Sequence, residues 1–279
     1  MSSLGFRSLV LVTGLLFAGT ATAESAPTSP GKSLDSEFKQ AAAAIARGSF
    51  GEAVDRLELL ADRGFVHPDA SFNRAVAYLG RARSPQREAG DLGRAAQALS
   101  ETLTLRPSDT QAESLLDSVR AEIGRKRARS GGANLVARPR LARAIAGLLP
   151  EGVWGVLAAL GSLSLAVGIA LRFRTREHGV PGALAIGVGA FLLVLGGALG
   201  FGARHFRRTS SPAVVVVDEA RLLDESGRPL QGRIAEGNVV PEGADVVLLE
   251  RRGGLARVEW GSTEGWVVGG QVRELPARP

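Results

Sequence analysis

The stretch Val153–Leu171 reads VWGVLAALGSLSLAVGIAL, and the stretch Val180–Ala203 reads VPGALAIGVGAFLLVLGGALGFGA. Neither stretch contains a charged residue, and each is close to the ~20 residues that an α-helix needs to cross a bilayer. The short segment between them, residues 172–179, is rich in arginine. The sequence therefore predicts a hairpin of two transmembrane helices with a soluble segment on each side.

The beginning of the chain, residues 1–23, has the form of a secretory signal peptide. An apolar run from Ser8 to Thr20 leads to an A-x-A cleavage site at residues 21–23. The alternative is an uncleaved signal anchor, and with either the chain after Glu24 is exported. Two further spans then place both soluble segments on the periplasmic face of a bacterial inner membrane, and only the loop 172–179 in the cytoplasm.

The basic residues are mostly arginines that cluster beside the predicted spans. The chain has 34 Lys and Arg against 28 Asp and Glu. Clusters lie in two predicted basic linkers, 130–152 and 204–212, as well as in the loop, so the positive-inside rule does not decide the orientation. We expect these clusters to contact the anionic lipid of the bilayer.

Composition also excludes several classes of function. Aromatic residues make up 5% of the chain and none is interleaved with the arginine clusters, so no base-stacking platform for nucleic acid is predicted. The absence of cysteine excludes disulfides, thiolate zinc sites and cysteine catalysis.

The segment 34–129 is predicted to be helical and follows a linker, residues 24–33, that is rich in Ser and Pro. Its apolar residues recur at three- and four-residue spacing. Ser49–Glu52 and Ser108–Gln111 each fit a capping box, in which two side chains bond the free amides at a helix start. A final helix is expected over Thr110–Arg129.

One pattern occurs at Gly48–Val54, GSFGEAV, and again at Gly90–Ala96, GDLGRAA. In each we expect the first Gly to end a helix, the bulky apolar residue to fix the turn and the small Ala to allow close packing. The pattern resembles the tetratricopeptide repeat, which has a period of ~34 residues. About two repeats and the final helix fit the segment, although Arg81–Ala89 adds residues to the family's spacing.

The resemblance implies that partners bind on the concave face formed by the first helix of each repeat. Residues 72–78 are similar to such a first helix, with Arg74 in place of the usual Leu. We expect Tyr78 to point into the core and Asn73 into the groove, where its amide would bond an extended peptide. Phe72 and Asn73 are therefore the candidate partner-binding residues. Fewer than ~3 repeats leave an apolar face that a cap or a partner must cover.

The predicted spans carry small residues at the four-residue spacing that lets membrane helices approach closely. The pairs are Gly155 with Ala159, Ala183 with Gly187, and Gly196 with Gly200. Neither span contains an ionisable residue, which argues against ion transport or a proton relay.

The period of the hydrophobic pattern changes to two in the segment 213–279. Strands are predicted at Val214–Val217, Asp245–Glu250 and Leu255–Trp260, and Gly253-Gly254 is typical of a tight hairpin turn. A second turn is expected at Gly261–Glu264.

These strands, with the turn Pro241-Glu242-Gly243 and the motif Gly265-Trp266-Val267, resemble the bacterial SH3-like barrel. The small, Ser-, Gly- and Pro-rich stretch that often follows the family's first strand is replaced here by Arg221–Asp224. Trp260 and Trp266 are the candidate residues of a barrel groove. Because a domain of ~65 residues buries little surface, packing is favoured for both, and an aromatic groove for peptide or glycan is the alternative.

No arrangement of residues indicates catalysis, and we expect neither a metal nor a cofactor. The histidines, His67, His178 and His205, are isolated in the sequence. No metal-ligand spacing, nucleophile elbow or phosphate loop is present. The expected fold class is a multidomain membrane protein with all-α tetratricopeptide-like repeats, two transmembrane helices and a small all-β SH3-like barrel.

The complete order of signal, repeats, two spans and barrel resembles the BatE-type proteins of the Bacteroides-aerotolerance (Bat) group. That resemblance implies a scaffold in an envelope complex linked to stress tolerance, with membrane-anchored von Willebrand A-domain proteins and a MoxR-type AAA ATPase as neighbours. The alternative hypothesis is a tether or sensor that holds peptidoglycan through the barrel.

Overall fold

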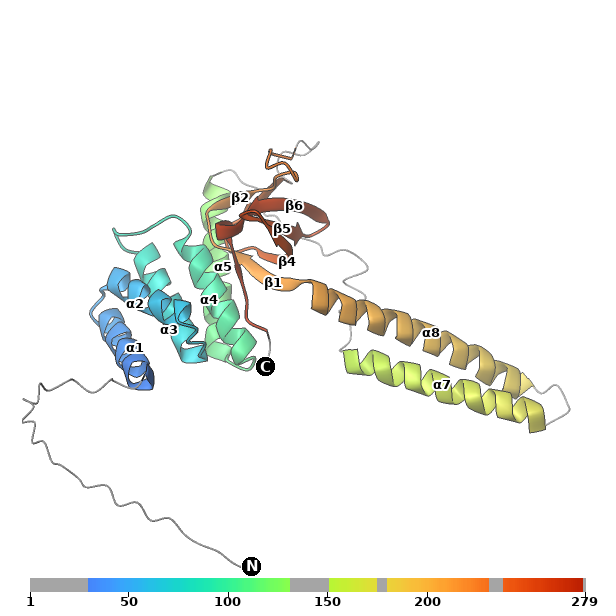
Figure 1. The fold of residues 1–279 in the computed structure, drawn as a ribbon. Coiled ribbons are helices and arrows are strands. Elements are labelled where there is room, and N and C mark those ends of the chain that lie inside the picture. The colour runs from blue at the N-terminus through green and yellow to red at the C-terminus, as the bar shows by residue number, and fades with distance from the viewer. Residues whose placement is uncertain (1–29, 131–150, 175–179, 231–237, 278–279) are drawn as a thin grey trace, which may run out of the picture.

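The computed structural model describes residues 30–130, 151–174, 180–230 and 238–277. A group of helices comes first, two long apolar helices follow, and a small antiparallel sheet ends the chain (Figure 1). This order confirms the coarse prediction of helical, apolar and sheet segments. The predicted signal peptide, most of the basic linker 130–152 and the residues 175–179 lie outside the described residues.

The helical segment consists of five helices in which each packs against the next. Their bounds are α1 Pro30–Ala46, α2 Phe50–Asp62, α3 Pro68–Ala82, α4 Asp91–Leu105 and α5 Thr110–Arg129. Ala53, Val54, Leu57 and Leu60 of α2, which follow the predicted three- and four-residue spacing, are buried. Tyr78 and Leu99 lie in the same core cluster. The expected final helix has the predicted bounds.

The predicted capping box of α2 is wrong. Ser49 is the N-cap residue, but its side chain makes no capping hydrogen bond. The carboxylate of Glu52 instead accepts hydrogen bonds from Arg47 and Arg56, at 3.2 and 3.1 Å. Two nearby guanidinium groups thus compete successfully with the backbone amide for this carboxylate.

Three other helix boundaries also differ from the prediction. Asp109, not Ser108, caps α5 by accepting a hydrogen bond from the Ala112 amide at 3.0 Å. Helix α1 begins at Pro30, so the end of the predicted linker 24–33 is helical. Gly90 does not end a helix, because α3 already stops at Ala82; it precedes α4 with a φ of 84°.

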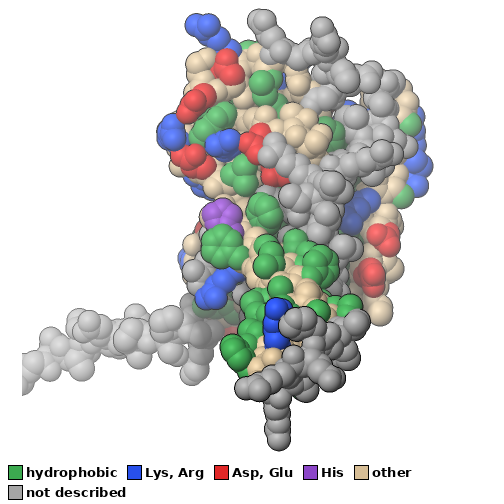
Figure 2. Space-filling model, turned by 90° about the vertical axis from the view of Figure 1, so that its right-hand side faces the viewer, with side chains coloured by type: hydrophobic (Ala, Val, Ile, Leu, Met, Phe, Trp, Pro, Cys, Tyr) green, Lys and Arg blue, Asp and Glu red, His purple; other side chains and the backbone are tan. Residues whose placement is uncertain are grey.

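Helices α7 (Glu151–Arg174) and α8 (Val180–Thr209) form a hairpin with extensive mutual contacts. Their segments Gly152–Phe173 and Gly182–Phe206 are long and apolar enough to cross a membrane. Only 17% and 11% of the most apolar windows is buried within the chain, unlike the core helix of a soluble protein. Figure 2 shows hydrophobic side chains gathered over the hairpin, while charged side chains spread over the rest of this face.

Glycines bring the two helices of the hairpin together, but only in part those predicted. A Cβ atom at Gly189 would lie 2.4 Å from the Leu165 amide nitrogen, and one at Gly196 would lie 2.8 Å from that of Ala158. Gly155 and Gly187 have nothing within 4 Å of that position, so the predicted contacts through their pairs are wrong. Gly189 and Gly196 are two turns apart and share the inner face of α8, whereas Gly187 faces outward.

Helix α8 continues almost directly into the first strand, β1 (Ser211–Val215). The Thr209 hydroxyl donates to the His205 carbonyl at 2.8 Å, and the Ser210 hydroxyl donates to the Phe206 carbonyl. The predicted basic linker 204–212 is therefore wrong: these residues extend the helix and begin the strand.

Five strands form an antiparallel sheet in the order β6-β5-β4-β1-β7, and β2 pairs with β3 in a separate ribbon. Their bounds are β2 Glu219–Arg221, β3 Val239–Pro241, β4 Asp245–Arg252, β5 Leu255–Trp260, β6 Thr263–Val268 and β7 Val272–Glu274, with the 3-10 turn η2 Gly269–Gln271 before β7. The sequence predicts no strand at β2 or β3, which have three residues each.

The turns of the sheet follow the glycines. Gly253 and Gly254 have φ values of 55° and 82° and join β4 to β5, as predicted. The next turn is tighter than predicted, because Trp260 already pairs with Thr263. Leu223 and Trp266 exchange backbone hydrogen bonds of 2.6 and 2.9 Å, which attach the chain after β2 to β6.

Candidate interaction sites

Phe72 and Asn73 lie on the half-exposed face of α3. Phe72 packs partly against the helical core, and Asn73 and Val76 are half-buried beside it. Tyr78 lies on the opposite side of the helix, 3% exposed, as its spacing from Asn73 requires. Phe72 and Asn73 therefore share one accessible surface, which we call the α3 face, together with Val76.

A buried ionic cluster stands on the other side of α3. The Arg74 guanidinium is 4% exposed and lies 2.6 Å from a Glu101 carboxylate oxygen and 3.7 Å from one of Glu58. Ser71 donates a hydrogen bond to Glu101 at 2.7 Å. Arg74, which stands where the expected repeat pattern has Leu, therefore links α3 to Glu58 of α2 and to Glu101 of α4 through ionic contacts.

The cluster extends from the helices to the last strand of the sheet. Arg273 of β7 lies 2.6 Å from Glu58, and the Tyr78 hydroxyl donates to Glu58 at 2.8 Å. Burial by itself would raise the pKa of Glu58, but the hydrogen bond from Arg273 and the charge of Arg74 outweigh it and hold that pKa below its usual value. Burial and the Glu58 charge raise the pKa of Tyr78 well above its ordinary range.

Two glycines of the repeated pattern let the sheet approach α4. A Cβ atom at Gly90 would lie 2.2 Å from the Val216 carbonyl oxygen, and one at Gly93 would lie 2.8 Å from that of Val215. The backbone amides of the two glycines also donate hydrogen bonds to carboxylates of the sheet segment. The Gly90 amide donates to Asp218 at 3.1 Å, and the Gly93 amide donates to Glu242 at 2.9 Å.

These two carboxylates cap α4 from a distant part of the chain, where the helix dipole favours negative charge. Lys126 of α5 lies 2.9 Å from both Asp218 and Glu242, and Glu242 is 5% exposed. Burial would raise the pKa of Asp218, but its hydrogen bond with Lys126 and the charge of Lys126 outweigh this and lower it. We call this contact between α4, α5 and the sheet the junction.

We expect Gly90→Ala to weaken the junction. The left-handed backbone at a φ of 84° disfavours any side chain by about 1–2 kcal/mol. The new methyl group also overlaps the Val216 carbonyl, and relieving such overpacking typically costs about 1–3 kcal/mol more. Urea unfolding of the full chain in detergent should therefore show a large loss of stability.

Gly48→Ala is the matched control for this substitution. Gly48 has a similar φ of 75°, but nothing lies within 4 Å of its added Cβ atom. This variant should lose only the stability that a side chain costs at a left-handed backbone position. Equal losses for the two variants would mean that the sheet does not press on α4 at Gly90.

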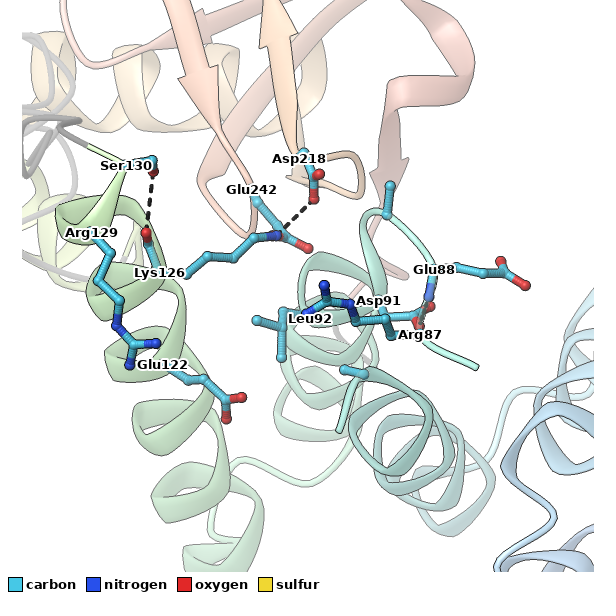
Figure 3. Close-up of a pocket in the computed structure, with 12 residues that line it drawn as sticks. Arg87, Glu88, Asp91, Leu92, Glu122, Lys126, Arg129, Ser130, Asp218 and Glu242 are labelled. Carbon is cyan, nitrogen blue, oxygen red and sulfur yellow. Dashed lines mark hydrogen bonds and ion pairs between the residues drawn. The ribbon is translucent and has the colours of Figure 1, made fainter. Parts of the chain in front are cut away.

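A pocket of about 710 Å³ opens beside the junction. Figure 3 shows its walls: the loop before α4, the end of α5, and the Asp218 and Glu242 side chains of the sheet segment. Arg87, Arg129 and Ser130 also line it. Among the residues that the structure describes, no group of three or more His, Asp or Glu is arranged to hold a metal ion.

The structure does not bring Trp260 and Trp266 together in one groove. Trp260 belongs to the core cluster of the sheet, whereas Trp266 lies on the opposite face, because it precedes the core residue Val267 by one position. Each is 7% exposed. The Arg252 guanidinium covers the Trp266 ring at 5.7 Å.

Comparison with family models gives no matching family, and comparisons with curated proteins and with solved structures give no match.

Sequence reasoning missed the junction. Asp218 and Glu242 are separated from their partners Gly90 and Gly93 by 128 and 149 positions, so no local pattern connects them. The repeated glycines were the available signal. The pattern predicts a helix end only at its first glycine, whereas the second glycine, inside the helix start, fits the close approach of another backbone.

Proposed function

We propose that this chain is a membrane-anchored, non-enzymatic scaffold that binds partner proteins through the α3 face. The observation that carries the proposal is the position of the sheet. The sheet segment contacts α2, α4 and α5 through Glu58, the α4 start and Lys126, and Phe72 and Asn73 remain half-exposed on the other side of α3. The Asn73 amide can hydrogen-bond the backbone of an extended peptide, and the Phe72 ring beside it can pack against an apolar side chain of that peptide.

The finer fold assignments are part of this proposal. We infer that α1–α5 are a tetratricopeptide-like unit, with α1–α2 and α3–α4 as its helix pairs and α5 as its cap. We also infer that the strands form an SH3-like barrel. The packing of consecutive helices and the closure of β6 onto Leu223 support these assignments.

The proposed location is the bacterial inner membrane, with both soluble segments in the periplasm. Ion pairs join the segment before the apolar hairpin to the segment after it, such as Arg120 with Asp245 at 2.6 Å. Two segments in contact must lie on the same side of a bilayer, so a hairpin that crosses twice is supported. The export signal predicted at residues 1–23 makes that side the periplasm.

The proposed partners are membrane-anchored proteins, in particular von Willebrand A-domain proteins of a Bat-type aerotolerance complex. The support is the resemblance in domain order to the BatE-type proteins and the attachment of the folded body to a membrane hairpin. The bilayer itself is the second partner, and we propose no nucleic-acid ligand.

We expect Asn73→Ala to leave folding intact and to reduce crosslinking to membrane partners. A substitution at an accessible position usually changes the free energy of unfolding by under ~0.5 kcal/mol. The measurement is crosslinking in membranes followed by purification of the full chain, with unfolding followed in parallel. Gln111→Ala, at an exposed position of α5, is the matched control.

If Asn73→Ala and Gln111→Ala give the same crosslinked partners in the same yield, the α3 face is not the binding surface. Tyr78→Ala should lose both folding and crosslinking, because Tyr78 is buried in the helical core and bonded to Glu58.

The alternative is a peptidoglycan tether or sensor that acts through the sheet. The observation that favours it is the position of Trp266 on the sheet face away from the core cluster, where the Arg252 guanidinium lies 5.7 Å from the centre of its ring. Retention of the full chain on purified cell-wall sacculi, lost in Trp266→Ala while the variant stays folded, would support this function over the scaffold.

A further inference from the structure

The pocket at the junction carries an inference that rests on the proposed scaffold function and names the chemistry of a partner. Its volume of about 710 Å³ is within the ~300–1,000 Å³ typical of ligand pockets. It lies between two parts of the chain that are far apart in sequence, and such boundaries are preferred positions of binding sites.

One wall of the pocket is the loop between α3 and α4, residues 83–90. Ion pairs and hydrogen bonds fix the conformation of this loop. Arg81 and Asp91, 6% and 1% exposed, form an ion pair of 2.7 Å beneath it. The Glu88 amide donates to Asp91 at 2.8 Å, and the Glu88 carboxylate lies 3.0 Å from Arg81. A loop fixed in this way loses little conformational freedom when it binds a ligand.

The carboxylates that line the pocket are already paired with cations of the chain. The pairs are Glu88 and Asp91 with Arg81, Glu122 with Arg83, and Asp218 and Glu242 with Lys126. The lining residues Arg87 and Arg129, in contrast, are exposed and form no ion pair within the described part of the chain. A ligand therefore meets two guanidinium groups that are free to bind.

We propose that this pocket binds an acidic segment of a partner protein, and that Arg87 and Arg129 pair with its carboxylates. The planar fork of a guanidinium matches a carboxylate with two parallel hydrogen bonds. The paired carboxylates nearby disfavour a doubly charged phosphate more than a singly charged carboxylate. Leu92, Ala82 and Ala89 add apolar lining, which suits a peptide better than a lipid headgroup.

The test measures binding of short fluorescent peptides to the full chain in phosphatidylcholine nanodiscs by fluorescence anisotropy. The probes are a six-residue peptide of alternating Gly and Glu and the same peptide with Gln in place of Glu. The double variant Arg87→Gln/Arg129→Gln should bind the Glu peptide at least tenfold more weakly than the wild type. The Gln peptide should not bind.

The matched control is Arg63→Gln/Arg251→Gln, which removes the same charge from exposed arginines that do not line the pocket. It should keep affinity within about threefold, since screening reduces the effect of distant surface charge. Equal loss in the control, or equal binding of the Gln peptide, would overturn the proposal. Displacement of the Glu peptide by an equal concentration of inorganic phosphate would assign the pocket to phosphate groups instead.

The outcome is separable from that of the scaffold function. Peptide binding that depends on Arg87 and Arg129 supports the pocket even if Asn73→Ala leaves crosslinking unchanged. If Asn73→Ala loses its partners and the Glu peptide does not bind the wild type, the scaffold stands and the acidic-segment inference is wrong.

Discussion

Arg74→Met is expected to destabilise the helical segment by about 3–5 kcal/mol, because it removes the cation of a buried ion pair and leaves the Glu101 charge without an opposite charge. The methionine fills most of the space but offers no donor to Glu101, whose side chain is only 12% exposed and lies 2.6 Å from the guanidinium. The free energy of unfolding of the full chain in detergent is the measurement.

Two comparisons make this expectation specific. Arg47→Met removes an exposed arginine whose pair with Glu52 is 57% and 42% exposed, so it should cost no more than about 1 kcal/mol. The double variant Arg74→Met/Glu101→Met should recover much of the lost stability, because two apolar side chains can replace a buried pair. An Arg74→Met variant as stable as Arg47→Met would contradict the structural role of the cluster.

Trp260→Ala is expected to cost about 3–5 kcal/mol, as for other large buried aromatic residues, and to unfold the sheet. Trp260 is 7% exposed and packs in the sheet core with Val258 and Val246. Trp266→Ala should also lower the free energy of unfolding, but by less, because Trp266 lies outside the core cluster of the sheet. Near-ultraviolet circular dichroism and urea unfolding measure both effects.

Val268→Ala is the control within the same strand as Trp266, since Val268 is 48% exposed. It should change the unfolding midpoint little. A Trp260→Ala variant that unfolds at the midpoint of the Val268→Ala variant would show that the sheet does not depend on this core.

The features that the sequence predicted well are those set by neighbouring residues. Helix α5 follows from its spacing and its polar start, and the Gly253–Gly254 turn follows because both positions need a positive φ. The hairpin of α7 and α8 follows from its hydropathy alone.

The features that it did not predict depend on contacts between distant segments. The sequence around Glu242 predicts a turn, and nothing in it indicates that the carboxylate meets the Gly93 amide. Arg74 was noted only as a departure from the repeat pattern, yet it is the centre of the buried cluster. The placement of Asn73 and Tyr78 on opposite sides of α3 follows from helical spacing, which is local, whereas the separation of Trp260 from Trp266 follows from the pairing of the strands.

The linker between α8 and β1 is so short that it limits how far the folded body can extend from the hairpin. Helix α8 ends at Thr209 and β1 begins at Ser211, and β1 is an inner strand of the sheet, paired with β4 on one side and with β7 on the other. With the hairpin in a bilayer, as proposed, a body mounted in this way is confined to a thin layer above the lipid and cannot search the compartment on a flexible linker. Encounters then occur by lateral diffusion in two dimensions, which favours ligands that are themselves anchored in the same membrane.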